Sequence, residues 1–90
     1  MKKIRMNVSG RVQGVGFRFM TKMVADELSI TGFARNEDDG TVTIEAVGED
    51  VNIERFIQKV KASPSPYGRV NHCTFEEDPT IKVTQRFLSL

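Results

Sequence analysis

Gly10-Arg11-Val12-Gln13-Gly14-Val15-Gly16-Phe17-Arg18 is the stretch that decides how this chain folds and where its chemistry lies. An alternating segment precedes it and a segment with helical spacing follows it, so it predicts a turn from a strand into a helix. Glycines let successive backbone N–H groups converge, and a helix start adds unpaired N–H groups and a positive dipole end. A guanidinium can hold two oxygens of one phosphate. The stretch therefore predicts an anion-binding site.

A second interpretation of the same stretch is a tight strand-to-helix connection that binds nothing. The glycines at 10, 14 and 16 do not fit the G-x-G-x-x-G pattern of dinucleotide-binding folds. No Gly-Lys-Ser/Thr follows, as a Walker-type loop would require. The sequence therefore does not indicate a nucleotide-binding site. The glycine-rich stretch by itself leaves open whether it binds an anion or only connects the strand to the helix.

The segments on either side of this stretch have clear periodicity. Ile4, Met6 and Val8 alternate with polar residues, which predicts a half-buried strand ending at Gly10. After Phe17, an apolar stripe at three- and four-residue steps predicts an amphipathic helix that ends near residue 29. Its members are Met20, Val24 and Leu28, widened by Met23. Phe19 lies outside this stripe, and the sequence does not decide whether it contacts the loop or a neighbouring strand.

The middle of the chain predicts a hairpin and a second helix. Residues 31–36 and 42–46 have strand character, and Asp39-Gly40 between them is a strong hairpin signal. Glu49-Asp50 suits a helix start, and the helix is expected to end before Ser63-Pro64-Ser65-Pro66. The residues expected on its buried face are Ile53, Phe56, Ile57 and Val60.

The last third predicts two more strands, at Val70 to Phe75 and at Ile81 to Phe87, with the inward set of the first one undecided. His72 and Cys73 are neighbours in a strand and point to opposite faces, so we expect no thiol–imidazole pair. The order strand, helix, strand, strand, helix, strand defines an α+β fold of the split βαβ type (βαββαβ). We therefore expect two helices on one face of an antiparallel sheet.

Length and charge limit the possible functions. At 90 residues, with 39% hydrophobic and 28% charged residues, the chain is expected to form one domain over residues 1–90. A net charge of +1 lacks the strong positive field of a general nucleic-acid binder, so anion recognition must be local. The single cysteine, Cys73, favours a reducing compartment, and we expect a cytoplasmic protein. No apolar run is long enough for a signal peptide or a membrane span.

Two parts of the chain resemble the signatures of the acylphosphatase family. The first is Val8 through Arg18, and the second is Gly32-Phe33-Ala34-Arg35-Asn36 followed by Gly40, Val42 and Gly48 at their present spacings. Together they span roughly the first half of the chain, and the strand and helix order extends the agreement. The C-terminal Leu88-Ser89-Leu90 departs from the usual ending of the family.

The resemblance implies a ferredoxin-like enzyme that hydrolyses acyl phosphates without a metal or cofactor. It implies that Arg18 and Asn36 are catalytic, Arg18 as a phosphate clamp and Asn36 as the holder of the attacking water. The implied phosphate cradle is the backbone of Gln13, Gly14, Val15, Gly16, Phe17 and Arg18. The expected partners are a small acyl phosphate as substrate and inorganic phosphate as product and competitive inhibitor, and the expected enzyme is a monomer.

Three other functions compete with this one. Glu37, Asp38 and Asp39 suggest a magnesium site, but an acidic hairpin tip is more often a solvated turn, and we assign no metal. A non-catalytic phosphate-sensing or interaction domain would use the cradle only to bind an anion, and Arg18 and Asn36 together weigh against it. RNA-recognition motifs share this element order, but they place aromatic residues on the central strands, and segments 3–8 and 41–45 have none. We therefore expect no nucleic-acid partner and no membrane.

Overall fold

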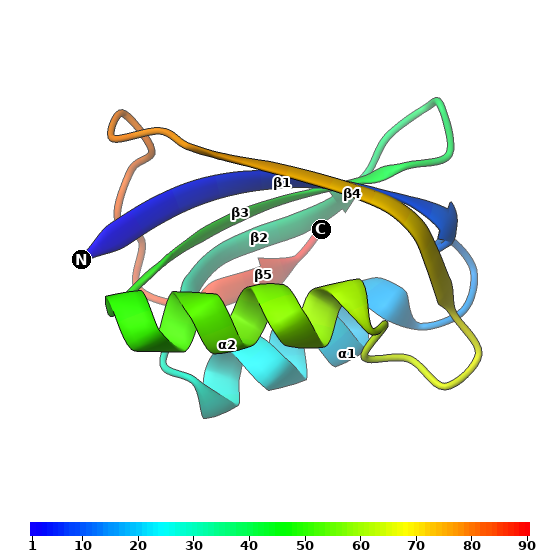
Figure 1. Ribbon diagram of the computed structural model, residues 1–90, viewed down its shortest axis with the longest axis horizontal. Coiled ribbons are helices and arrows are strands. Elements are labelled where there is room, and N and C mark those ends of the chain that lie inside the picture. The colour runs from blue at the N-terminus through cyan, green and yellow to red at the C-terminus, as the bar shows by residue number, and fades with distance from the viewer.

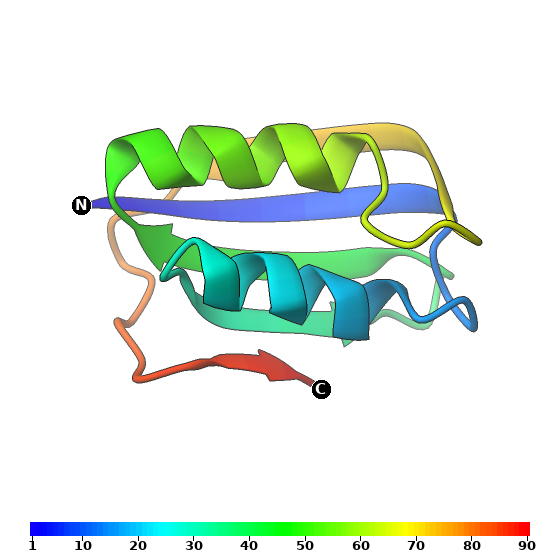
Figure 2. The ribbon, with the colours of Figure 1, turned by 90° about the horizontal axis from the view of Figure 1, so that it is seen from below.

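Two helices lie on one face of a five-stranded sheet in the computed structural model, which describes residues 1–90 (Figure 1). The elements are β1 (Lys2–Arg11), α1 (Phe17–Glu27), β2 (Thr31–Asn36), β3 (Val42–Gly48), α2 (Asp50–Lys61), β4 (Arg69–Glu77) and β5 (Phe87–Ser89). The strand order across the sheet is β4-β1-β3-β2-β5, and Figure 2 shows both helices in front of it. The predicted split βαβ fold is confirmed. Four strands are antiparallel, and β5 adds a parallel pair with β2.

The core lies between the sheet and the helices, as the sequence periodicity predicts. Ile4, Met6 and Val8 of β1 are fully buried, and the intervening residues of that strand are only partly buried. All four residues expected on the inner face of α2 are buried. The largest buried rings are Phe17, Phe56 and Phe87, one from each helix and one from β5. Neither helix has the length and apolar composition needed to cross a membrane.

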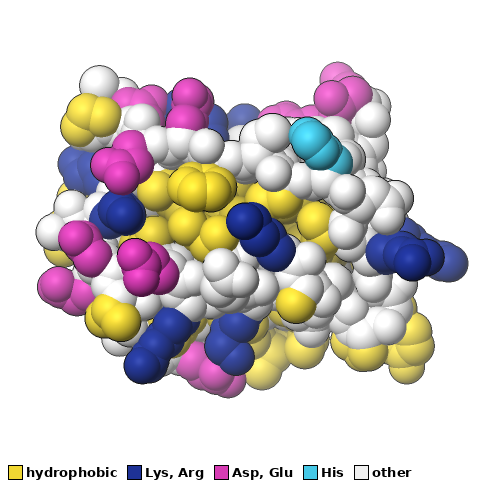
Figure 3. All heavy atoms as spheres, in the orientation of Figure 1, with side chains coloured by type: hydrophobic (Ala, Val, Ile, Leu, Met, Phe, Trp, Pro, Cys, Tyr) yellow, Lys and Arg dark blue, Asp and Glu magenta, His cyan; other side chains and the backbone are white.

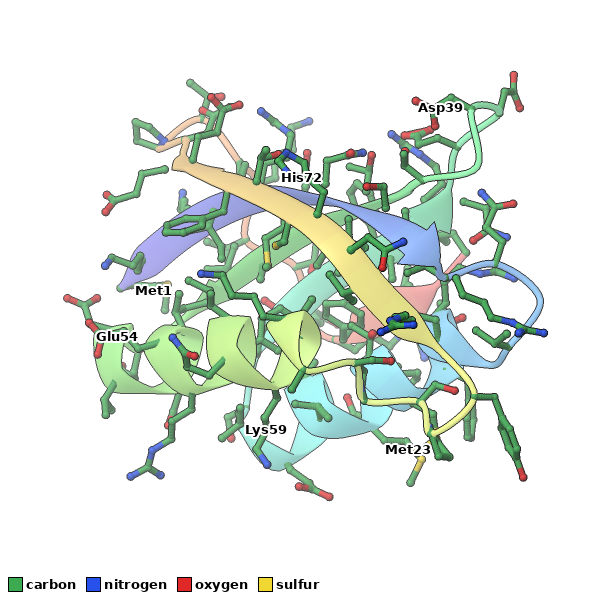
Figure 4. The ribbon with its side chains drawn as sticks, turned by 45° about the vertical axis from the view of Figure 1, so that its right-hand side comes forward. Met1, Met23, Asp39, Glu54, Lys59 and His72 are labelled. Carbon is green, nitrogen blue, oxygen red and sulfur yellow. The ribbon has the colours of Figure 1, made fainter.

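The inner face of α1 differs from the prediction by one position. Thr21 and Ala25 are fully buried, whereas Val24 and Leu28 are partly buried at the edge of the core. Met23 is 45% exposed and points away from the molecule in Figure 4, so its assignment to the core was wrong. Small side chains at the line of contact let the helix lie close to the sheet, and the larger ones flank it. Counting apolar residues alone therefore selects the wrong centre of the stripe.

A β-bulge explains why the inward set of β4 could not be chosen from periodicity. The pairing of β1 with β4 shifts between Ser9 and Gly10. One extra residue on the bulged strand breaks the period of two, so Val70 and Cys73 both pack against the core although they are three residues apart. His72 is exposed on the opposite face (Figure 4), and burial raises the pKa of the Cys73 thiol. As predicted, the two side chains point apart.

The predicted strand from Ile81 to Phe87 is wrong, because the last strand is Phe87–Ser89. β4 and β5 form opposite edges of the sheet, so the chain between them must cross the end of the sheet and cannot pair within it. This crossing begins at Asp78, which accepts hydrogen bonds from the backbone N–H and the hydroxyl of Thr80 at 2.9 and 2.6 Å. Arg5 on the helix-free face of the sheet donates to the same carboxylate at 2.9 Å. These bonds, those from Thr80 first, hold the pKa of Asp78 below its ordinary value.

An apolar strip between α2 and β4 stays uncovered, and Figure 3 shows its side chains from the side of Figure 1. Phe75 is 50% exposed there, and the ammonium group of Lys61 lies 5.6 Å from the centre of its ring. A groove of about 680 Å³ runs along this strip. It is larger than the other hollows on the surface, but none of the expected site residues, 13–18 and Asn36, lines it.

Gly32 provides a test of how closely β2 and β3 approach. Its φ is +137°, and a Cβ atom would collide with the backbone carbonyl of Glu45. We expect Gly32→Ala to lower the free energy of unfolding by about 3 kcal/mol or more, from steric overlap plus backbone strain. Urea denaturation measures this change.

Gly40→Ala is the matched control, since its φ is +90° but open space surrounds the added Cβ. This control should lose only about 1–2 kcal/mol, the cost of a left-handed backbone at a residue with a side chain. Equal losses in the two variants would contradict the close approach.

Candidate active site

The loop of residues 12–16 joins β1 to α1 at the end of the molecule where β2 and β5 also finish (Figure 2). Gly14 and Gly16 have φ values of +75° and +77°, in the left-handed region. A Cβ atom at either position would meet nothing within 4 Å, so backbone conformation, and not lack of space, is what favours glycine here. Gly16 caps the start of α1 with its backbone and offers no side chain to the first N–H groups. Those donors remain free to face a ligand.

A small hollow of about 130 Å³ lies at the start of α1. Arg18 takes part in none of the protein's ion pairs, whereas Arg5, Lys22 and Arg35 each contact a carboxylate. Its guanidinium is therefore the positive charge available at this hollow. The residues that line it are Val12, Gly14, Gly16, Phe17, Arg18, Phe19 and Ser89.

Gln13 has a role that its sequence position did not reveal. Its side-chain amide nitrogen donates to the backbone carbonyls of Glu37 and Thr41, both at 2.9 Å. Glu37 and Thr41 close the β2–β3 hairpin through their own backbone hydrogen bond of 2.8 Å. The Gln13 side chain thus fastens the glycine loop to the hairpin that carries Asn36. Only the backbone of Gln13 was expected in the cradle, because a side-chain contact across 24 residues leaves no periodic signal in the sequence.

Ser65 braces the loop from the other side. The residue is 2% exposed, and its hydroxyl donates to the backbone carbonyl of Val15 at 2.6 Å. The same oxygen accepts a hydrogen bond from the backbone N–H of Tyr67 at 3.2 Å. In the sequence, this segment is recognisable only as a proline-containing loop after α2. Its function as a support for residue 15 follows from the fold.

Asn36 is the last residue of β2, and it lies opposite Val42 of β3. It shares the helix-covered face of the sheet with Ala34, which is fully buried. Its side-chain oxygen is buried and has no hydrogen-bond partner within the protein. A buried acceptor without a donor costs about 1–3 kcal/mol, so this oxygen is suited to receive a donor from a ligand or water.

Arg18 and Asn36 are brought to the same end of the same face. Arg18 lines the hollow together with Ser89, and Ser89 pairs with Ala34, two residues before Asn36. Gln13 links the loop to Glu37, the residue after Asn36. The C-terminal segment that departs from the usual family ending is therefore part of this end of the molecule.

The acidic hairpin tip does not converge on one point. Glu37 accepts hydrogen bonds from the hydroxyl of Thr43 at 2.7 Å and from Arg35 at 3.3 Å, and these contacts lower its pKa, Thr43 first. Asp39, at the tip in Figure 4, accepts from the hydroxyl and backbone N–H of Thr41, which lower its pKa. Nowhere in the chain do three or more His, Cys, Asp or Glu side chains form a group that could hold a metal ion.

The split βαβ sheet, with a glycine loop and a hollow at the start of α1, defines a class of small α+β domains. The acylphosphatase family model matches residues 4–88. An acylphosphatase from Enterococcus faecalis is 59% identical over 87 residues, which are 97% of this chain and 96% of that protein. One from Pediococcus pentosaceus is 54% identical over 91% of each chain.

Solved structures agree with the sequence relatives. The crystal structure of acylphosphatase from Bacillus subtilis superposes with a TM-score of 0.94 at 37% identity, over 100% of this chain and 99% of that one. An acylphosphatase structure from Coxiella burnetii gives 0.91 at 30% identity, over 99% and 92%. The chain belongs to the acylphosphatase family, and its activity is the hydrolysis of acyl phosphates. The resemblance found in the sequence is thereby confirmed.

The Gln13 contact gives a prediction that separates positioning from substrate contact. Gln13→Ala removes both bonds to the hairpin, and a small displacement of reacting groups is costly in rate. We expect kcat/KM for acetyl phosphate to fall by roughly tenfold or more. Gln58→Ala, on the exposed side of α2, is the matched control and should match the parent. Equal kinetics for the two variants would show that the bridge does not position the site.

Proposed function

We propose that Arg18 and Asn36 perform the acyl phosphate hydrolysis, with the phosphoryl group bound by the backbone N–H groups of residues 13–18. The observation that carries this proposal is the hollow at the start of α1, which Arg18 lines together with two left-handed glycines. A planar guanidinium stays charged at any relevant pH and bonds two phosphoryl oxygens at once. Backbone donors at a helix start add to the same charge stabilisation.

The chemistry needs no acid for the leaving group. An acyl phosphate releases a carboxylate, whose conjugate acid has a pKa of about 4, so the departing oxygen leaves without a proton. Water attacks phosphorus, the bond from phosphorus to the acyl oxygen breaks, and its electron pair stays on the carboxylate. Both protons of the water end on the inorganic phosphate product, through transfer of one to a phosphoryl oxygen.

Asn36 orients the attacking water in this scheme. The buried side-chain oxygen that no protein donor satisfies accepts a hydrogen bond from the water. An amide is too weak a base to remove the proton, which supports direct transfer from water to the substrate. Positioning and electrostatics then supply the rate enhancement, as in phosphoryl transfer generally.

A monomer is the proposed active unit. Inorganic phosphate presents the same oxygens as the substrate and acts as a competitive inhibitor. A lone, half-buried Cys73 is compatible with a cytoplasmic protein.

Arg18→Ala tests the clamp. An arginine directed at a transferring phosphoryl group is worth roughly 10³–10⁵ in rate, so kcat/KM for benzoyl phosphate should fall by at least about 10³. Arg18→Lys should not restore it, because an ammonium group cannot form the bidentate contact. Arg55→Ala, exposed on α2, is the control. A kcat/KM for Arg18→Ala near that of Arg55→Ala would remove Arg18 from the mechanism.

Asn36→Ala separates water positioning from phosphate binding. We expect kcat to fall by roughly 10², the scale of a misplaced reactant, while the inhibition constant for inorganic phosphate changes much less. Steady-state kinetics with and without added phosphate give both values. A loss of phosphate affinity as large as the loss in kcat would argue for a binding role.

A further inference from the structure

Phe19 is an exposed aromatic residue at the rim of the phosphate hollow. It belongs to the first turn of α1 and lines the hollow together with Arg18 and the loop glycines, yet it is 59% exposed. Phe17, two residues earlier, is 1% exposed and belongs to the core. Packing in the core therefore explains why residue 17 is a phenylalanine, but it does not explain the phenylalanine at position 19. A large ring left in solvent beside a reactive site is available to cover an apolar group.

Phe19 lies within reach of the acyl group of a bound substrate. Its side chain lines the same hollow as Arg18 and the loop glycines. An acyl group is joined to the phosphoryl group through one oxygen, so it extends from the phosphate site toward the residues around it.

The phosphate cradle cannot distinguish one acyl phosphate from another, because every substrate presents the same phosphoryl group. An enzyme discriminates between two substrates through a difference in how tightly it binds them. For two acyl phosphates this difference must come from residues that contact the acyl group. Two rim residues come from different elements, Phe19 from α1 and Ser89 from β5. Ser89 is small, so it leaves room beside the Phe19 ring for a flat or branched apolar group.

We infer that Phe19 is the residue that contacts the acyl group of the substrate, and that its ring distinguishes large apolar acyl groups from small ones. This inference rests on the proposed role of the hollow as the phosphate site. The acyl ring packs against the face or edge of the Phe19 ring, and both lose contact with water. Small or polar acyl groups gain little from this contact.

The test compares kcat/KM for benzoyl phosphate with kcat/KM for acetyl phosphate in each variant, which cancels the intrinsic difference in reactivity of the two substrates. Relative to the parent, Phe19→Ala should lower the benzoyl-to-acetyl ratio by about tenfold, and Phe19→Tyr, which keeps the ring, should retain it. Phe75→Ala is the matched control, since it removes another half-exposed phenylalanine far from the hollow. Its ratio should equal that of the parent.

An unchanged benzoyl-to-acetyl ratio in Phe19→Ala would overturn the inference. This holds also if kcat/KM falls by the same factor on both substrates, because equal losses indicate a general structural effect. Failure of the proposed phosphate site gives a different result. In that case Arg18→Ala would keep its activity on both substrates, whatever the ratio in the Phe19 variants.

Discussion

Two hydrogen bonds from the side chain of Gln13 hold the glycine loop against the β2–β3 hairpin, and the geometry of the site depends on this contact. The loop contributes backbone donors and leads directly into Arg18, whereas the hairpin contributes Asn36. The two segments carry different groups of the proposed site, so its geometry depends on how they are held relative to each other. Ser65 braces the opposite side of the loop through the carbonyl of Val15. The catalytic proposal thus depends on side chains that need not touch substrate.

The molecule has no broad region of positive charge that could attract an anion from a distance. The net charge is only +1, and several basic side chains are already engaged: Arg5 with Glu45 and Asp78, and Lys22 with Asp26. Arg18 has no such carboxylate partner. Arg18 is the charged residue that lines the hollow at the start of α1, so in the proposed mechanism a phosphoryl group meets one guanidinium and a helix start in place of a broad positive field. Small substrates suit this arrangement, because they need recognition at a single point.

The sequence predicted those parts of the fold that follow a simple period or a short motif. The alternation of β1, the inner face of α2 and the Asp39-Gly40 turn all follow local rules. The two signatures singled out Arg18 and Asn36, whose roles stay a prediction. What failed depended on distant contacts. The β4 bulge opposite Ser9 and Gly10 breaks the period, and β5 is positioned by a crossing of the sheet. The bonds made by Gln13 and Ser65 join segments 24 to 50 residues apart.

The central claim is that the backbone of residues 13–18, with Arg18 and Asn36, encloses one phosphate. The most direct measurement is a titration of the isotope-labelled protein with inorganic phosphate, followed by NMR through its backbone and side-chain amide signals. The account predicts saturable shifts concentrated at residues 13–18 and at the side-chain amide of Asn36, with the groove between α2 and β4 unchanged. Shifts centred on that groove, or none at the loop while phosphate inhibits the enzyme, would contradict it.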